Sequence, residues 1–438
     1  NATDNAFKLY NYATSAYAFV IASDGSLSTP TLGTSNVRFG VNAGNSIASG
    51  GNFNVAVGDE AGTAITTGDD NVAVGYGALD LEDTGSANTA IGRDSLSTLN
   101  YNGTGFNTAV GWNSGFSVST GQQNTLVGAS AGRYSTTTDG STFIGYLAGQ
   151  GITGTKLTGN NNTAVGASAG LLLQGAATNN TLVGANAGDA ITTATYNTLM
   201  GYAAGSGLTD GGTNAAFGTE TLFAETSGVE NTAIGHGASA QQNGGSENTS
   251  IGTLAGYQIT TGDNNLSLGH DAARTGSPGG AVQSQSNQIC IGDENITHAN
   301  VQVDWSIASD QRDKTDFTAL DLGLDFVKAL APVTYKWDKR SKYGDKTADG
   351  YDLNAQSPDG THKEDWLDIG FKAQEVQALE EAAGYTTAAK KNLTVSTSGD
   401  GKQMGLQYSK FVPILVKAIQ EQNALIEALT ARVTTLEG

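Results

Sequence analysis

The sequence predicts a mainly β protein, in which a long array of glycine-rich β repeats precedes a smaller α+β domain that ends in a coiled coil. Of the 60 glycines, 50 precede residue 309 and 10 follow it. A glycine-closed pentad recurs through the first part, and a heptad-like apolar spacing marks the last helix. We therefore expect four regions: 1–35, of unclear fold; 36–304, repeats; 305–411, a globular domain; and 412–438, a coiled-coil helix.

The repeat is defined by the glycine that closes pentads such as Asn107-Thr-Ala-Val-Gly111. About 15 such units follow one another, most often at a step of 17 residues. A short unit of nearly constant length indicates a β-solenoid or β-roll. The closing glycines are Gly40, Gly58, Gly75, Gly92, Gly111, Gly128, Gly145, Gly166, Gly184, Gly201, Gly218, Gly235, Gly252, Gly269 and Gly292.

The pattern inside the unit indicates a short strand. The residue before the closing glycine is always apolar, and Thr or Val dominates two residues earlier. This β-branched content predicts a strand of about four residues. Alanine predominates three residues after the glycine, where backbones should approach closely. Since one unit buries few apolar groups, we expect lateral association into a homotrimer.

The repeat resembles the head repeats of trimeric autotransporter adhesins and related repeats of phage tail fibres, over roughly residues 36–292. Three units carry insertions, which we expect to form loops; they are Thr98–Phe106, Gly151–Asn161 and Arg274–Asn287. Tyr101 and Trp112 are candidates for stacking on sugar rings, although packing is the more common role of isolated aromatic residues. The array thus offers surfaces for binding but no strong binding motif.

Catalytic and metal motifs in the array are weak. Ser130 and Ser168 each lie in a G-x-S-x-G pentad, but Asn186 takes the same place in another unit, which indicates a variable repeat position. Single histidines in separate units do not suggest a metal site; they are His236, His270 and His298. We expect no metal and no cofactor.

The stretch Ser309-Asp310-Gln-Arg312-Asp-Lys314 lies at the change of composition. A serine hydroxyl needs a base to act as a nucleophile. Lys314 can be that base if burial lowers its pKa from about 10.4, because desolvation disfavours the ammonium form. A spacing of five does not align two side chains on a helix, so a turn must bring them together. From these residues alone, a helix N-cap at Ser309, with Asp310 and Asp313 in the first turn, is the favoured alternative.

Further landmarks follow this stretch. They are Leu322-Gly-Leu-Asp-Phe326, Leu330-Ala-Pro-Val-Thr-Tyr335-Lys-Trp337, Ile369-Gly-Phe-Lys-Ala-Gln374-Glu375-Val376 and Tyr408-x-x-Phe411-Val-Pro413. Together they resemble the self-cleaving intramolecular chaperone domain of phage endosialidases, tailspikes and tail fibres. The resemblance implies a cut between Ala308 and Ser309, a Ser309–Lys314 catalytic pair, and possible support from Asp310 and Arg312. Ser341–Asp365 is longer and more polar than the resemblance leads us to expect.

The last helix carries apolar residues at alternating spacings of three and four, with β-branched residues alternating with Leu and one polar Gln. The seam is Val412, Leu415, Ile419, Gln422, Ile426, Leu429, Val433 and Leu436. In isolated peptides this choice of residues leans towards two strands, whereas the resemblance implies three. We expect a trimer, with Gln422 fixing the register.

These features predict a trimeric phage tail fibre or tailspike segment that is assembled in the host cytoplasm and carried on the virion. Its expected partners are a host surface receptor, possibly a glycan, and other virion tail proteins. The net charge of −20 disfavours nucleic acid and anionic membranes. No apolar run reaches the roughly 18 residues of a membrane span, so we expect no membrane insertion. The alternatives are a bacterial surface trimeric adhesin and a tailspike glycan hydrolase with an inter-chain site.

Overall fold

The computed structural model describes residues 7–11, 16–21, 27–28, 32–302, 305–346, 348, 350–386, 388, 391 and 393–438. The chain forms two compact units. The first comprises Asn1–His270 with Ser286–Ile289, and the second comprises Asp271–Gln285 with Cys290–Gly438.

A small antiparallel sheet opens the first unit, in the region for which the sequence predicted no fold. Its strands pair in the order β1-β2-β3. They are β1 (Phe7–Asn11), β2 (Ala16–Ile21) and β3 (Leu27–Ser28).

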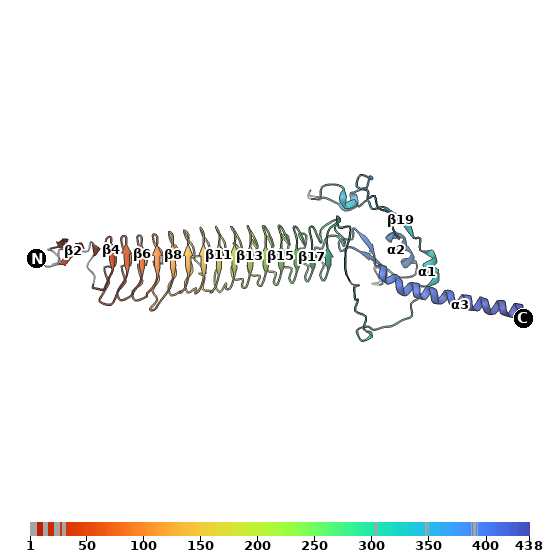
Figure 1. The fold of residues 1–438 in the computed structure, drawn as a ribbon, viewed down its shortest axis with the longest axis horizontal. Helices are drawn as coiled ribbons and strands as arrows, with labels where there is room; N and C mark the ends of the chain where they lie inside the picture. Colours follow the sequence, from red (N-terminus) through yellow and green to blue (C-terminus); the bar gives the residue numbers. More distant parts are fainter. Residues whose placement is uncertain are drawn as a thin grey trace. The chain divides into compact units, whose positions relative to one another are not determined.

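The repeats form a parallel β-solenoid, as predicted. Each turn contributes one strand, and the strands stack in chain order (Figure 1). The strands have three residues rather than the expected four. They are β4 (Val37–Phe39), β5 (Val55–Val57), β6 (Val72–Val74), β7 (Thr89–Ile91), β8 (Thr108–Val110), β9 (Thr125–Val127), β10 (Thr142–Ile144), β11 (Thr163–Val165), β12 (Thr181–Val183), β13 (Thr198–Met200), β14 (Ala215–Phe217), β15 (Thr232–Ile234), β16 (Thr249–Ile251), β17 (Leu266–Leu268) and β18 (Ile289–Ile291).

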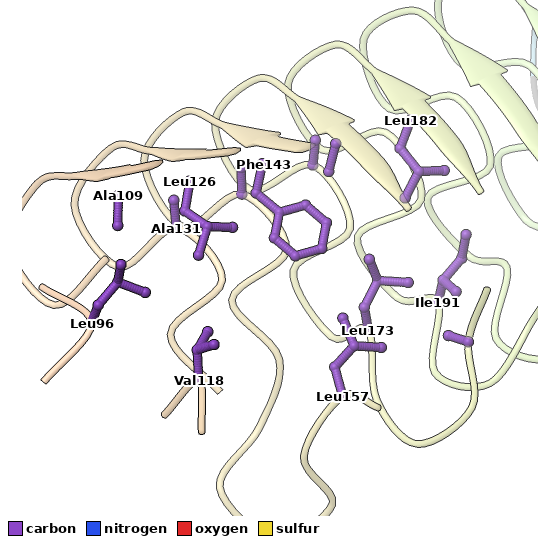
Figure 2. Close-up of a cluster of buried hydrophobic side chains, with 14 of the residues drawn as sticks. Leu96, Ala109, Val118, Leu126, Ala131, Phe143, Leu157, Leu173, Leu182 and Ile191 are labelled. Carbon is purple, nitrogen blue, oxygen red and sulfur yellow. The ribbon is translucent and has the colours of Figure 1, made fainter. Parts of the chain in front are cut away.

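Only the middle residue of each strand points into the solenoid. Ala109 pairs with Leu126, and Leu126 pairs with Phe143, so the inward residues stack directly on one another. All three are buried (Figure 2). Because successive side chains of a strand alternate between faces, the first and last residues of each strand point outward.

Two further columns of inward side chains complete the core. One lies three residues after the closing glycine, where Ala131 and its equivalents are buried as the sequence predicted. The other lies seven residues after it, as at Val118 and Ile191 (Figure 2). The insertion Gly151–Asn161 still places Leu157 in this core, because Leu157 bridges to Ser135 and Gly175 of the neighbouring turns.

The closing glycines pack backbone against backbone. Gly128 has a φ of +136°, and a Cβ placed on it would lie 2.3 Å from the carbonyl oxygen of Gly145. No side chain fits that contact, and the φ value is one that other residues rarely adopt. The pentad therefore ends in glycine for a packing reason that recurs from turn to turn between Gly40 and Gly252.

A ladder of buried asparagines runs beside the strands. The Asn214 amide group donates to the Gly228 carbonyl at 2.9 Å, and its Oδ1 accepts the backbone N–H of Asn231 at 3.0 Å. The same pair of bonds recurs at Asn197 and Asn231, for example. Since each asparagine pairs buried backbone groups of the next turn, it satisfies groups that would be costly to leave unpaired.

The second unit is a small α+β region that ends in a long C-terminal helix, as predicted. It has two separate two-stranded antiparallel sheets, β19-β20 and β21-β22. In chain order its elements are η1 (Gln311–Asp313), α1 (Leu324–Ala329), β19 (Val333–Tyr335), η2 (Arg340–Lys342), η3 (Leu353–Ala355), β20 (Asp368–Gly370), α2 (Ala373–Ala382), β21 (Val395–Thr397), β22 (Met404–Leu406), η4 (Tyr408–Lys410) and α3 (Phe411–Glu437).

The core of the second unit gathers α1, α2, β21 and the start of α3. Its buried residues are Leu322, Phe326, Val376, Val395, Phe411 and Ile414. A polar contact fixes α1 on α3, because the Glu421 carboxylate accepts the backbone N–H of Leu324 at 2.7 Å. This hydrogen bond lowers the pKa of Glu421.

The polar segment Ser341–Asp365 contains the end of η2 and all of η3, and Ser341 and Leu353 are buried among its described residues. The Tyr343 hydroxyl donates to Asp338 at 2.6 Å, and the Asp338 carboxylate also accepts the backbone N–H of Gly360 at 2.9 Å. These bonds organise a segment for which the sequence offered no clear fold. Among the described residues, no helix is long and apolar enough to cross a bilayer.

Candidate functional site

The predicted cleavage site lies in an exposed loop. Every described residue from Asn295 to Ala319 is exposed, and the 3-10 turn η1 is the one regular element in that part of the loop. Large apolar side chains are among them, with Trp305 78% and Ile307 73% exposed. A peptide bond in such a segment is accessible to a nucleophile and can be cut without breaking a sheet or a helix.

The turn η1 brings Ser309 and Lys314 together. The Lys314 Nζ donates a 2.6 Å hydrogen bond to the Ser309 Oγ across five residues. Lys314 follows the turn directly, and its backbone N–H donates to the carbonyl of Gln311 at 3.2 Å. A turn rather than a helix thus aligns the two side chains, in agreement with the spacing argument.

Asp310, not Ser309, caps the turn. Its Oδ1 accepts the backbone N–H of Arg312 at 2.9 Å, and the Arg312 side chain forks onto the same carboxylate at 2.6 to 3.1 Å. The Arg312 guanidinium lowers the pKa of Asp310, and Asp310 in turn raises the pKa of Arg312. The pair therefore braces the turn between the serine and the lysine, which leaves the Ser309 hydroxyl available to Lys314.

A nucleophile and a base within hydrogen-bond distance form the minimal arrangement for covalent catalysis. Ser309 and Lys314 have that arrangement, but both are exposed in the single chain. An exposed lysine keeps its ammonium hydrated, and an ammonium has no lone pair to accept a proton. The geometry is in place, whereas the desolvation that would make Lys314 a base is not provided by this chain alone.

The last helix has two faces with different surroundings. Phe411, Ile414 and Ala418 are buried. The predicted seam lies elsewhere on the helix and is exposed throughout, for example 58% at Ile419 and 50% at Val433. No described residue of the chain covers it. An apolar face of this length, left uncovered along α3, is typical of a surface that packs on another helix.

The solenoid also has an outward apolar column. It consists of the residues before the closing glycines, none of which is buried; Ile144, Met200 and Ile234 are each 39% exposed. The sequence identified this column as apolar but not the face on which it lies.

Other candidates from the sequence are placed as follows. Ser130 and Ser168 have positive φ angles of 59° and 58°, and Asn186 has the same geometry at 57°, so the apparent nucleophile motif is a turn position of the repeat. Tyr101 is partly buried against the solenoid core. Trp112 is half exposed, with the Arg133 guanidinium 5.7 Å from its ring centroid.

No cluster of three metal-ligating side chains occurs in the part of the chain that the structure describes.

The sequence analysis did not predict two sets of polar residues that the structure shows. Glu82 and Glu225 are buried in the solenoid, in the column that elsewhere holds residues such as Val118. Three lysines between 339 and 346 contact Glu294 and Asn295, upstream of the predicted cut. The partners of the last set are about 50 residues apart, so no local pattern could have revealed them.

Comparison with known protein families gives a match in the second unit. No curated protein and no solved structure matches the chain significantly. Residues 309–385 match the model of a peptidase family described as "Chaperone of endosialidase". The match begins at Ser309, the residue that Lys314 contacts. The segment that follows the β-solenoid is therefore similar to a family of autoproteolytic chaperone domains.

Proposed function

We propose that the chain is a trimeric tail-fibre or tailspike segment, whose C-terminal module directs trimer assembly and then cuts the bond between Ala308 and Ser309. Ser309 is the nucleophile and Lys314 is the base. The repeats resemble adhesin heads and tail-fibre repeats, and the mature fibre binds a receptor on the host surface, for which a glycan is the candidate.

The hydrogen bond from Lys314 to Ser309 carries this proposal. It joins a nucleophile to a candidate base at the first residue of the segment that matches the chaperone family. It also lies in an exposed loop that follows the solenoid sequence, where a cut breaks the covalent link between the repeats and the C-terminal segment.

The chemistry follows from the positions of the atoms. The Ser309 hydroxyl attacks the carbonyl carbon of Ala308, and its proton passes to the uncharged amine of Lys314. The C–N bond breaks as the Ser309 nitrogen takes up a proton, which leaves Ala308 as an ester on Ser309. Water then hydrolyses the ester to a free carboxylate and the original hydroxyl.

This reaction needs a neutral Lys314 amine, which burial favours. The single chain leaves Lys314 exposed, so the missing burial has to come from another copy of the chain. Cleavage would then follow assembly, and an unassembled chain would keep its chaperone module.

Two surfaces support a homotrimer. The seam of α3 is apolar, regular and uncovered along the helix. The outward column of the solenoid repeats at every turn, so only a partner with the same spacing can contact it along its length. A parallel copy of this chain has that spacing.

A trimerising module solves a kinetic problem of such fibres. Pairings between three chains are non-local and slow to form. A module that trimerises first raises the local concentration of the three arrays and fixes their register. Cleavage afterwards leaves a fibre that persists because unfolding is slow. The place of the fibre is the virion tail, among other tail proteins, after assembly in the host cytoplasm.

A denaturing gel and intact-mass analysis of the expressed chain test the proposal. We expect two fragments, 1–308 and 309–438. A chain that assembles but stays uncut would refute the autoprotease. A C-terminal fragment that begins at Asp310 would keep self-cleavage but reassign the bond.

A further inference from the structure

The proposed cut lies inside a compact unit rather than between two. The second unit comprises Asp271–Gln285 and Cys290–Gly438, so it includes residues on both sides of the bond between Ala308 and Ser309. The loop that carries the bond is exposed, whereas the contacts between the two sides described below are made at its upstream end and beyond it. A cut in the loop leaves those contacts in place.

Lysines of the module hold the chain just upstream of the loop. The Lys346 Nζ forms an ion pair with the Glu294 carboxylate, whose side chain is only 7% exposed. The Lys339 Nζ donates to the backbone carbonyl of Glu294 at 2.9 Å, and the Lys342 Nζ donates to the Asn295 side chain. A nearly buried carboxylate would be costly to leave without its cation.

A second set of contacts joins the insertion before β18 to the turn between β21 and β22. The Gln285 side chain donates to the carbonyl of Gly399 at 2.8 Å, and the backbone N–H of Ala281 donates to Asp400 at 3.3 Å. A Cβ on Gly280 would lie 2.5 Å from the Asp400 carboxylate, so glycine is what permits this approach.

We propose that these two sets, which we call the clasp, hold the module to the N-terminal fragment after the cut. The clasp consists of Gly280–Gln285 with Glu294 and Asn295 on one side, and of Lys339–Lys346 with Gly399 and Asp400 on the other. The partner of the free module is thus the fragment that ends at Ala308. The inference rests on the proposed function for the origin of the cut, but not for the contacts themselves.

The clasp makes release a step separate from cleavage. Its contacts are ionic and polar, so high salt weakens them, most strongly where they are exposed. Loss of Lys346 leaves the Glu294 carboxylate buried and unpaired, which raises the dissociation rate rather than slowing association. The cut alone therefore yields a nicked complex, and ionic conditions determine when the module leaves.

The test separates retention from self-cleavage. A site for an added protease is inserted after Trp305 in the full chain carrying Ser309→Ala, so that the loop is cut whether or not the chain cuts itself. Size-exclusion chromatography with light scattering then follows the fragments at about 50 mM and about 1 M NaCl. We expect co-elution at low salt and dissociation that is faster at high salt. Separation at low salt would overturn the proposal.

Charge reversal identifies the contact. Lys346→Glu should speed dissociation roughly tenfold or more, and Glu294→Lys in the same chain should restore retention. Lys328→Glu is the matched control, because Lys328 is exposed and pairs within α1 with Asp325 at 3.6 Å. Equal behaviour of the Lys346 and Lys328 variants, or no rescue by the swapped pair, would show that the clasp does not hold the fragments. The parent chain with Ser309 intact reports self-cleavage separately.

Discussion

The Lys314 Nζ lies 2.6 Å from the Ser309 Oγ, although both side chains are exposed. Local folding of a three-residue turn is enough to align the two groups. It is not enough to remove water from the lysine, on which its action as a base depends. The turn therefore meets the first requirement for cleavage, and we propose that assembly of several chains meets the second by burying the lysine.

Ser309→Ala should leave the chain at full length, because no hydroxyl remains to attack Ala308. Ser306→Ala is the control, since Ser306 lies in the same exposed loop and has no part in the proposed reaction. Intact mass after assembly distinguishes the two variants. Cutting of the Ser309 variant at the same bond would assign the reaction to another nucleophile.

Lys314→Ala and Lys314→Arg should both block cleavage without preventing trimer formation. Alanine removes the base, and a guanidinium keeps the charge but does not accept the proton at working pH. Time courses of cleavage, with light scattering to confirm the trimer, measure this, and a processed Lys314→Arg chain would exclude Lys314 as the base.

Ile419→Asp should prevent trimer formation and, with it, cleavage. The change places a charge in the middle of the exposed seam, where three helices are proposed to meet. Ala424→Asp is the control, since Ala424 is exposed and lies off the seam on the same helix. Light scattering gives the mass of each variant. A trimer that forms as readily with Ile419→Asp as with Ala424→Asp would contradict the coiled coil.

Deletion of residues 309–438 from the gene should prevent assembly of the array. Separation of the same residues from the assembled protein after cleavage should leave the array intact. Each turn of the solenoid buries only a few apolar side chains, and it does so within its own chain, so the array has little means to set register between chains. An assembled fibre should persist without the C-terminal module, because its many stacked turns unfold slowly. If the chain shortened before synthesis gives soluble, heat-resistant trimers, the chaperone role is wrong.

Glu82→Gln should flatten the pH dependence of array stability. Burial raises the pKa of Glu82, although its carboxylate accepts the N–H groups of Gly85 and Tyr101 at 2.7 and 3.2 Å. A carboxyl with a raised folded-state pKa favours the folded state at low pH. Its contribution is lost as pH rises from the unfolded pKa, about 4.3, through the folded one.

The thermal midpoint of the uncut chain, followed from pH 4 to 7, measures this loss. Gln242 already occupies the equivalent buried position in another turn, where its amide donates to Gly245 at 2.8 Å, so the solenoid accommodates the substitution. Glu247→Gln, at an exposed site, is the control for the change in net charge. Equal slopes for the two variants would show that Glu82 is not the group responsible.

The repeat period determined the solenoid from the sequence alone. Every turn has to bury the same few columns, so residues such as Ala131 and Ala164 recur at fixed distances from a glycine. The pairing of Ser309 with Lys314 was also predictable, since five residues are few enough for one turn to join them. A repeat period, and contacts between residues a few positions apart, can be read directly from the sequence.

Only the tertiary structure showed which side chains point into the solenoid, which point outward, and which residues distant in sequence are in contact. The spacing of Val165 from its glycine indicated a strand, but only the stacked strands show that this column points outward and Ala164 inward. The Asn ladder became evident only when each Asn was placed beside its hydrogen-bond partners in the next turn, as at Asn214. Ala281 meets Asp400 across 119 residues, a contact that no local pattern encodes because chain folding, not sequence proximity, creates it.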